Sequence, residues 1–348
     1  MLRQLAALTR RIPAAGPRAL ALAVYSDSAG EHAEARESGV EGVACVDDAA
    51  RACILLCRLW VATGNDALKR WAKGLLDFIL WMHAGDGRWV NFVYDWEGTK
   101  NTHGLTSAPG INYWQARAMH ALAEVNRLFD DGRTRAILGG ALLAAQSGSP
   151  PSDVRSIHAL GALALLAVGP DPWLSTRLAQ WCDELVGCQR NGMLMNSPDE
   201  RGRPHLWGHI QEAVLADASI VLGKNGLRAL AVSSAKAVFG EAIESGFDLQ
   251  HIHSYDVQSA VFVMDRLAAV TGQRRYLELA QKARSWFDGR NPASAQVFDR
   301  ATGRVADGID NATLNSRSGA ESTISAGLAL LDDPLVLSTA RSWKGGAW

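Results

Sequence analysis

The sequence predicts an all-α protein built from paired helices. Apolar residues recur at helical spacing along most of the chain from residue 47 to residue 342. Short turns, several containing glycine, such as Gly64-Asn65, separate one helical run from the next. Alternating apolar and polar runs of the kind that form strands are few and short.

The first 44 residues differ from the rest and read as an N-terminal extension. Residues 2–12 are amphipathic with apolar positions at helical spacing, which predicts a short helix, and Pro13 and Pro17 then break the pattern. Residues 26–43 are rich in Gly, Ser, Glu and Ala, so we expect a loop there.

From residue 47 the chain repeats one unit, which is two helices joined by a turn. Alanine, leucine and the periodic apolar positions support each helix. The predicted pairs are 47–63 with 66–83, 112–129 with 133–146, 153–168 with 172–189, 207–222 with 227–244, 256–271 with 274–288, and 319–331 with 334–342.

Helix-pair repeats bury their apolar faces only by stacking on neighbours, as an open solenoid or as a closed ring. We expect the ring, an (α/α)6 toroid of six helical hairpins forming one domain over residues 45–348, with short strands or hairpins in the rim loops. The first helices, such as 157–168 and 260–270, are nearly apolar, whereas second helices such as 274–284 carry more charge. The first helices are therefore predicted to form the inner ring, with their N-termini on one rim.

The amino-acid composition argues against several classes of protein. The chain has 348 residues, 48% apolar content and a net charge of −1, with both signs mixed and no basic stripe, so a nucleic-acid partner is not expected. No apolar run reaches the roughly 18 residues of a membrane span.

The five cysteines have no metal-type spacing, and their odd number favours a reducing compartment, the cytoplasm. Arg10-Arg11 leaves a twin-arginine export signal open as the alternative.

The motif Asp47-Asp48-x-x-Arg51 opens the first inner helix. Carboxylates suit a helix start, and Arg51 is placed to reach either of them, so a capped and salt-bridged first turn is one explanation. The other inner helices, however, also begin with clusters of Trp, His, Gln, Arg and carboxylates. Capping does not explain those residue types, whereas a polar and aromatic pocket at the mouth of a toroid does.

Such a pocket suits a sugar, because sugars need both hydrogen bonds and flat apolar faces. The chain has 12 tryptophans against 8 phenylalanines and 5 tyrosines, and its longest polar loops precede inner helices. We therefore expect an oligosaccharide or polysaccharide as the partner. The predicted substrate-binding residues are Arg51, Asp95, Trp96, His103, Asn112, Tyr113, Trp114, Arg117, Trp207, His209, Gln211, His253, Tyr255, Gln258, Asn315 and Arg317.

Glycoside hydrolysis needs a carboxylic acid that protonates the leaving oxygen and a second carboxylate that activates water or attacks carbon. If the ring closes, the sixth inner helix lies beside the first, so Glu321 would neighbour Asp47 and Asp48. We predict Glu321 as general acid and Asp48 as general base, with Asp47 as its alternative and Asp256 as a further candidate. The competing explanation for Glu321 is a capping box with Ser318.

No cofactor or metal is predicted. The pairs His205/His209 and His251/His253 have metal-like spacings, but no third ligand stands in an obvious motif. No glycine-rich phosphate loop of either common type is present.

Three segments resemble those of known families. Residues 46–52 (Val-Asp-Asp-Ala-Ala-Arg-Ala) resemble the T-D-D-N-A-R-A motif of uncharacterised bacterial (α/α)6 proteins associated with sugar transferases, with Ala49 in place of Asn. Residues 87–92 resemble the G-R-F-x-N-F segment that follows in them, and 286–292 are similar to the W-x-x-G-x-N-P of inverting cellulases. The likeness spans roughly residues 45–325 and implies the six-hairpin glycosidase superfamily, without implying a substrate.

Other functions remain open on the same fold. A polysaccharide lyase or a sugar epimerase or isomerase would use His209, His253 or Tyr255 as the base. A helical-repeat module that binds glycans or a protein without catalysis is a third reading. A terpene-cyclase interpretation of Asp47-Asp48 is disfavoured because the expected pocket is too polar for a hydrocarbon. The oligomeric state is not predicted.

Overall fold

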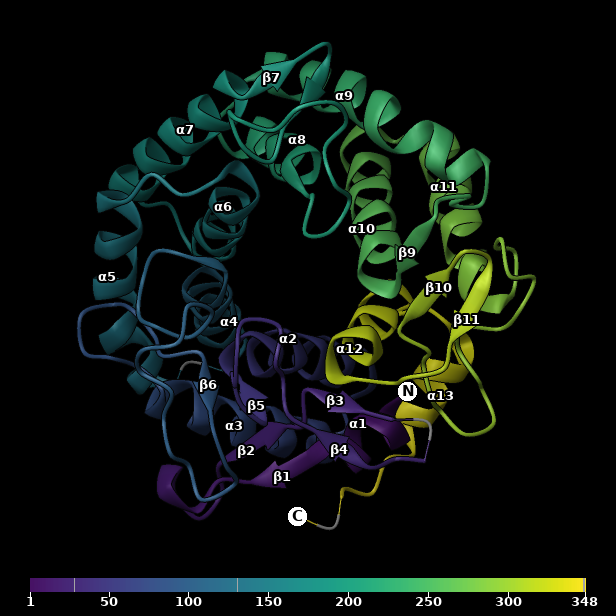
Figure 1. Cartoon of the computed structure of the whole chain (residues 1–348). Helices are drawn as coiled ribbons and strands as arrows, with labels where there is room; N and C mark the ends of the chain where they lie inside the picture. The colour runs from purple at the N-terminus through teal and green to yellow at the C-terminus, as the bar shows by residue number, and fades with distance from the viewer. Residues whose placement is uncertain (28, 130, 347) are drawn as a thin grey trace. The chain divides into compact units, whose positions relative to one another are not determined.

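A computed structural model describes residues 1–27, 29–129, 131–346 and 348, and most of these residues are helical (Figure 1). The chain divides into two compact units. Unit 1 comprises residues 1–148, 298–307 and 316–348, and unit 2 comprises residues 149–297 and 308–315.

Unit 1 is built around helix α2, whose apolar residues are buried on nearly every side. Helix α2 packs against α3, α4 and α12, so the first helix of the sixth predicted pair lies beside the first helix of the first pair (Figure 1). The helices of this unit are α1 (Leu2–Leu8), α2 (Val46–Thr63), α3 (Asp66–Trp81), α4 (Tyr113–Phe129), α5 (Gly132–Ser147), α12 (Ala320–Ala329) and α13 (Pro334–Arg341).

The turn between α2 and α3 shows how the sequence ends one helix and starts the next. Gly64 has a φ of 70°, the left-handed conformation that a residue without Cβ adopts at low cost, and its N–H donates to Trp60 O. Asn65 then caps α3 by accepting a hydrogen bond from Ala67 N at 2.9 Å.

The N-terminal 44 residues pack into unit 1 with short strands. The helix expected over residues 2–12 is wrong beyond Leu8, because residues 9–11 pair with residues 20–22 across the turn made by Pro13 and Pro17. The predicted loop over 26–43 contains short strand pairing, with residue 28 outside the described residues. The elements are β1 (Thr9–Arg11), η1 (Pro13–Ala15), β2 (Leu20–Leu22), β3 (Tyr25–Ser26), β4 (His32–Ala33), β5 (Ala44–Cys45) and β6 (Phe92–Val93).

In unit 2 the first helices of three predicted pairs pack in succession, α6 against α8 and α8 against α10, and each contacts its own partner helix. This packing agrees with the apolar character of the first helices. The helices are α6 (Ser152–Leu166), α7 (Pro172–Gly187), α8 (Gln211–Val221), α9 (Asn225–Glu244), α10 (Ser254–Thr271), α11 (Arg274–Arg284) and η2 (Ser285–Asp288); the strands are β7 (Gln189–Arg190), β8 (Met193–Leu194), β9 (His251–His253), β10 (Gly308–Asp310) and β11 (Thr313–Asn315).

One helix start in unit 2 differs from its prediction in a way that changes the site. Helix α8 was expected from Trp207 but begins at Gln211. Gly208 has a φ of 65°, which no α-helix accommodates, so residues 207–210 form a turn in front of the helix. Trp207 and His209 therefore lie on a loop.

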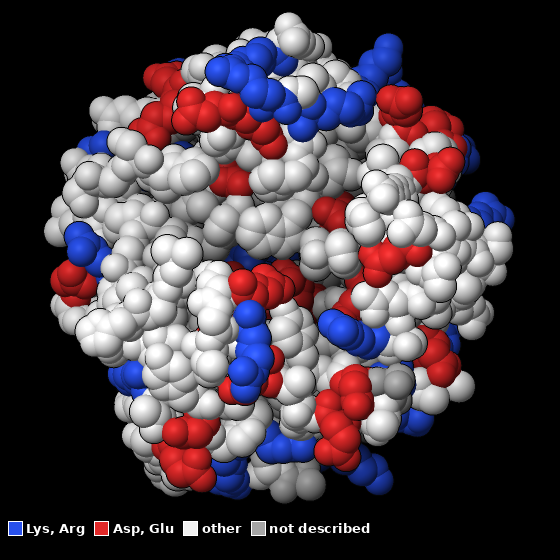
Figure 2. Space-filling model, in the orientation of Figure 1, with Lys and Arg blue, Asp and Glu red and all other residues white. Residues whose placement is uncertain are grey.

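No helix among the described residues has both the length and the apolar content needed to cross a membrane. Acidic and basic side chains both occur across the face shown in Figure 2, with uncharged surface between them.

Candidate functional site

The first turn of α2 is fixed by a cysteine cap. Cys45 is the N-cap residue, and its sulfur accepts a hydrogen bond from Asp48 N at 3.4 Å. Asn91, which precedes β6, accepts from Asp47 N at 3.2 Å and its carbonyl accepts from Val46 N at 2.9 Å. These contacts set the direction in which the carboxylates at 47 and 48 project.

Arg51 is the centre of a cluster of three carboxylates in unit 1. Its Nη2 donates to Asp48 Oδ1 at 2.7 Å, its Nε lies 3.1 Å from Asp47 Oδ1, and its Nη1 lies 3.0 Å from Glu321 Oε1. The structure thus brings residues from the first and sixth predicted pairs together on one guanidinium. The Asp48 Oδ1 and Glu321 Oε1 atoms can be no further apart than about 8 Å, because they contact two nitrogens of one planar group.

A second arginine joins the cluster from α4. Arg117 Nη1 donates to Asp47 Oδ1, and the Arg117 guanidinium lies over the ring of Tyr113, 5.2 Å from its centroid. Asp47 therefore contacts two arginines, and Asp48 and Glu321 also contact one of them, Arg51.

The start of α12 is positioned by the loop that precedes it. Asp307 Oδ1 accepts hydrogen bonds from Gly319 N at 2.9 Å and from Ser322 Oγ at 2.7 Å. Gln4 Nε2 donates to Ser318 O at 2.9 Å. Glu321 thus projects from a helix end that is fixed on both sides.

The three carboxyl groups differ in proton affinity. Burial raises the pKa of the Asp48 carboxyl to about 6; Arg51 opposes this, and the negative charges of Glu321 and Asp47 add to it. Burial acts on Asp47 in the same direction, but the charges of Arg117 and Arg51 outweigh it and lower the pKa of Asp47. The pKa of Asp48 therefore lies closer to neutral pH than that of an ordinary aspartate, whereas the pKa of Asp47 lies further from it.

The carboxyl groups also differ in access to solvent. The side chain of Glu321 is 33% exposed and that of Asp47 16% exposed, whereas Asp48 as a residue is only 2% exposed. A ligand arriving from solvent would meet Glu321 first. Arg51 contacts all three carboxylates, and its role in binding substrate stays a prediction.

The other predicted residues of unit 1 lie at the surface or support the chain locally. Asp95 accepts from Gly98 N and Thr99 N in a turn, Asn112 accepts from Gln115 N at the start of α4, and Trp114 Nε1 donates to Trp89 O at 2.9 Å. Half-buried Trp96, and exposed His103 and Arg317, complete the set.

In unit 2, four predicted or neighbouring rings form a series at the starts of α8 and α10. The centroids of His205 and Trp207 are 5.8 Å apart, those of Trp207 and Tyr255 are 6.4 Å apart, and those of Tyr255 and His253 are 4.8 Å apart. The last two rings are stacked, at 13°. We call these four residues the aromatic series.

Carboxylates flank the aromatic series. His205 Nε2 lies 3.6 Å from Asp153 Oδ2 at one end, and His253 Nδ1 lies 3.5 Å from Asp256 Oδ2 at the other. Asp256 also accepts from His253 N at 2.8 Å, which closes a capping box on α10. Asp256 is thus engaged in structure, and its role as an acid or base stays a prediction.

Two predicted substrate ligands of unit 2 are buried. His209 and Gln211 have no exposed surface, and both bond to Asn196 Oδ1, at 2.7 and 2.8 Å. His209 Nε2 is also 3.0 Å from Glu212 Oε1, which accepts from Ser234 Oγ at 2.5 Å. We call these five residues the buried network, which joins the loop before α8 to α9. The substrate-binding roles of His209 and Gln211 stay predictions.

The remaining predicted residues of unit 2 are Gln258, which is half-buried on α10, and Asn315, whose Nδ2 donates to Asp310 Oδ2 at 3.2 Å. Asp310 also contacts His251 Nδ1 at 2.9 Å. Among the described residues no group of three or more His, Cys, Asp or Glu side chains is arranged to hold a metal ion.

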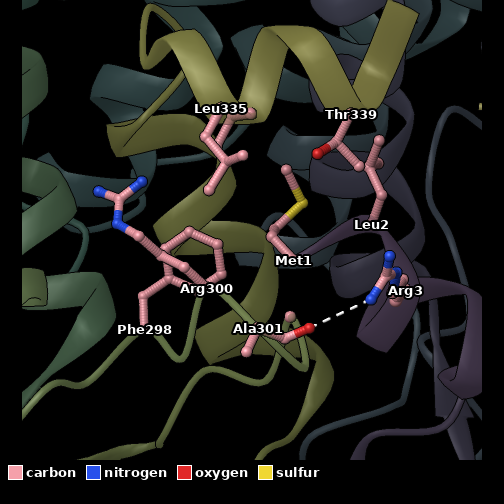
Figure 3. Close-up of a pocket in the computed structure, with 10 residues that line it drawn as sticks. Met1, Leu2, Arg3, Phe298, Arg300, Ala301, Leu335 and Thr339 are labelled. Atoms are coloured by element: carbon pink, nitrogen blue, oxygen red, sulfur yellow. Dashed lines mark hydrogen bonds between the residues drawn. The ribbon is translucent and has the colours of Figure 1, made fainter. Parts of the chain in front are cut away.

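A separate cavity of about 130 Å³ lies elsewhere in unit 1 (Figure 3). Phe298 and Leu335 line one side and Leu2 lies on the other, while Arg3 Nη1 donates to Ala301 O at 3.1 Å. None of the predicted site residues lines this cavity.

Two residues that support the site were not singled out from the sequence as parts of it. Cys45 was considered only as one of five cysteines, although its place directly before an apolar helix that starts with two aspartates is an N-cap position. Asp307 sits in a long loop, twelve residues before the backbone N–H that it caps, and no local sequence signal marks that contact.

Comparison with known proteins identifies the fold. No protein-family model matches the chain, and no curated protein matches it by sequence. Among solved structures, a D-mannose isomerase superposes with a TM-score of 0.71 at 10% identity, covering 97% of this chain and 96% of that one. The cellobiose 2-epimerase of Bacillus thermoamylovorans B4167 gives 0.71 at 11% identity, covering 95% and 96%.

A glycoside hydrolase family 9 endoglucanase, J30, superposes with a TM-score of 0.59 at 14% identity, covering 95% of this chain and 83% of that one. Likeness at such identities shows the fold, which is the all-α (α/α)6 toroid, as the sequence predicts. It leaves the reaction to be argued from the residues of this chain.

Proposed function

We propose that this protein is a carbohydrate-active enzyme and that the cluster around Arg51 is the acid–base centre of a glycoside hydrolase. The observation that carries the proposal is that three carboxyl groups from two helices contact one guanidinium, with one of them, Asp48, able to hold a proton near neutral pH. Acid–base cleavage of a glycosidic bond needs a protonated carboxyl and an ionised carboxylate side by side.

The different exposures of the three carboxyl groups support one assignment of catalytic roles. Glu321, the most exposed of the three carboxyl groups, is the general acid that protonates the leaving oxygen, as the sequence predicts. Asp47, ionised and partly exposed, takes the proton from the attacking water while the bond from the anomeric carbon to the leaving oxygen breaks. Asp48, which the sequence predicts as the base, is only 2% exposed, and in this proposal it holds the proton that recharges Glu321 after cleavage. Asp47 passes the proton taken from water to Asp48, which restores the starting state.

The geometry is compatible with this chemistry. Glu321 Oε1 and Asp47 Oδ1 contact Arg51 at 3.0 and 3.1 Å, so these oxygens are at most about 8 Å apart. Carboxyl separations of about 5–9.5 Å cover the glycosidases that retain and those that invert the anomeric configuration.

A sugar substrate is supported by two further points. Solved structures with the same fold include sugar epimerases, a D-mannose isomerase, an endoglucanase and an α-mannanase. The aromatic series offers flat rings beside hydrogen-bonding groups, which is what a pyranose ring binds. Because all five cysteines lack disulfide partners, we also propose a reducing compartment, the cytoplasm.

The second candidate is a sugar epimerase or isomerase with a histidine base in unit 2. The stacked pair of His253 and Tyr255, with Asp256 beside the imidazole, favours it. So do the higher TM-scores of the isomerase and the epimerase, 0.71 each against 0.59 for the endoglucanase.

Product analysis separates the candidates. Incubation with cellobiose, cellohexaose, α-mannan oligosaccharides and D-mannose in D2O, followed by NMR, detects new reducing ends and deuterium at C2 of the sugar. Hydrolysis predicts new reducing ends, abolished in Glu321→Gln and retained in His253→Ala. Deuterium at C2 that is lost in His253→Ala and retained in Glu321→Gln would indicate epimerisation or isomerisation and not hydrolysis. Binding without any product would indicate a glycan-binding module.

A further inference from the structure

A neutral side chain, the thiol of Cys45, donates a hydrogen bond to the Asp48 carboxyl. Cys45 Sγ donates to Asp48 Oδ2 at 3.3 Å, while Asp48 N donates back to the same sulfur at 3.4 Å. Cys45 is 4% exposed, so solvent does not compete for either bond. The thiol and the guanidinium of Arg51 each hold one oxygen of the carboxyl.

The position of the sulfur is fixed by the backbone on both sides. Cys45 is paired with Phe92 in the antiparallel β5–β6 ladder, and the next residue, Val46, donates its N–H to Asn91 O at 2.9 Å. The backbone of Cys45 therefore cannot move away from Asp48 without breaking strand pairing, and the hydrogen bond from Asp48 N favours the side-chain rotamer that keeps the sulfur beside the carboxyl. A different side chain at position 45 would face the same oxygen.

The charged and titratable groups around Asp48 come from four elements. Asp47 and Arg51 lie on α2 itself, Glu321 acts from α12, and Tyr25 acts from β3. Arg117 on α4 reaches the cluster through Asp47. Arg51 is shared by three carboxylates, whereas the thiol of Cys45 donates to Asp48 Oδ2.

We propose that Cys45 is a positioning residue whose thiol holds the Asp48 carboxyl and sets how readily it releases its proton. This inference rests on the proposed function for its catalytic meaning, but the contact itself can be tested without turnover. Burial raises the pKa of the Cys45 thiol, so the thiol stays protonated, and remains a donor, over the range in which Asp48 titrates.

The choice of sulfur has a physical consequence. An S–H group is a weak donor, whereas an O–H group forms a shorter and stronger bond to a carboxylate. Hydrogen bonds to the ionised form of an acid lower its pKa. A cysteine at this position therefore leaves Asp48 with a higher proton affinity than a serine would, which keeps a proton in the cluster near neutral pH.

The test compares Cys45→Ser, Cys45→Ala and the wild-type full chain by ¹³C NMR of labelled aspartate carboxyls from pH 4 to pH 9, with the Asp48 signal assigned by its absence in Asp48→Asn. The expected result is opposite shifts: the Asp48 pKa falls in Cys45→Ser and rises in Cys45→Ala, each by about 0.5–1 unit. The control pair is Cys53→Ser and Cys53→Ala, because Cys53 is an equally buried thiol on α2 that bonds to Ala72 O. These control variants leave the Asp48 signal unchanged.

The outcomes separate this inference from the proposed function. If Asp48 titrates alike in wild type and Cys45→Ser, or moves in the same direction in both Cys45 variants, the thiol does not set its proton affinity and the inference is overturned. Cys45→Ser conserves shape, so it gives the answer even if Cys45→Ala fails to fold. A third outcome is that the Asp48 pKa shifts in opposite directions in the two variants while the wild-type protein hydrolyses no glycoside. That result would uphold the role of the thiol and show that the proposed glycoside hydrolysis is wrong.

Discussion

The first turns of α2 and α8 carry similar polar residues but use them differently. At α2, three carboxyl groups surround Arg51 and two of them are partly open to solvent. At α8, His209, Gln211 and Glu212 are wholly buried and bond to Asn196 and Ser234. Polar residues at the start of an inner helix are therefore not sufficient evidence of a ligand site, because burial decides which of them a substrate can meet.

The charge balance of the two regions differs as well. The α2 cluster contains more carboxyl groups than arginines, and their mutual repulsion contributes to the raised pKa of Asp48. The buried network contains one carboxylate, Glu212, whose Oε1 contacts His209 and Ser234. The first arrangement is suited to proton transfer and the second to holding a loop. Four substitutions test this contrast.

The largest expected effect is on catalysis. Glu321→Gln removes the proposed general acid and should lower kcat by about 10²–10⁴-fold, because a positioned proton donor typically contributes that factor. Glu241→Gln is a matched control, since Glu241 is exposed on α9 and distant in sequence from the cluster. Steady-state kinetics of both variants check this, and a Glu321→Gln enzyme with wild-type kcat would contradict the assignment.

The next effect is on stability and concerns the buried network. Glu212→Ala removes the buried acceptor that His209 Nε2 and Ser234 Oγ share, while His209 keeps its contact with Asn196 and Ser234 its contact with Leu194 N. The variant should lower the free energy of unfolding by about 1–3 kcal/mol, the usual cost of leaving buried polar groups unsatisfied. Urea denaturation measures it. A loss below about 1 kcal/mol would mean that the network does not hold the loop before α8.

A third substitution, Asp48→Asn, tests how Asp48 in the α2 cluster makes stability depend on pH. The folded-state pKa of Asp48, about 6, lies above its ordinary value of 3.8, so the native state binds the extra proton and wild-type stability falls as pH rises through the window between about 4 and 6. Asp48→Asn should remove this component. Between pH 4 and pH 7, wild type should therefore lose about 2–3 kcal/mol more of its unfolding free energy than Asp48→Asn does.

Denaturation of wild type and Asp48→Asn at pH 4 and pH 7, each in low and high salt, measures this difference in unfolding free energy. Asp217→Asn in unit 2 is measured in the same way as a comparison outside the cluster. The expectation for Asp48 fails if the difference is the same at pH 4 and pH 7.

The smallest effect concerns the cap of α12. Asp307→Ala removes the acceptor for Gly319 N and Ser322 Oγ and should cost about 1 kcal/mol of stability, as loss of a helix cap does. Because Glu321 projects from this turn, kcat should fall while thermal unfolding changes only slightly. Equal kcat values for Asp307→Ala and wild type would show that the cap does not position Glu321.

Much of the architecture could be predicted because its signals are local and periodic. The helix pairs follow from apolar spacing, and the meeting of Glu321 with Arg51 follows from placing the sixth inner helix beside the first. The burial of His209 and Gln211 could not be predicted, because it depends on the left-handed backbone of Gly208 and on contacts with Asn196, thirteen and fifteen residues away. The contact of Cys45 with Asp48 was missed because cysteine is a rare cap.

The most direct test of the central claim is the crystal structure of Glu321→Gln with an uncleaved oligosaccharide from the set that wild type hydrolyses. The account predicts that the glycosidic oxygen lies within about 3.2 Å of the side chain at position 321, with Asp47 on the opposite side of the anomeric carbon. A sugar bound productively elsewhere, with the scissile bond more than about 5 Å from position 321, would contradict it.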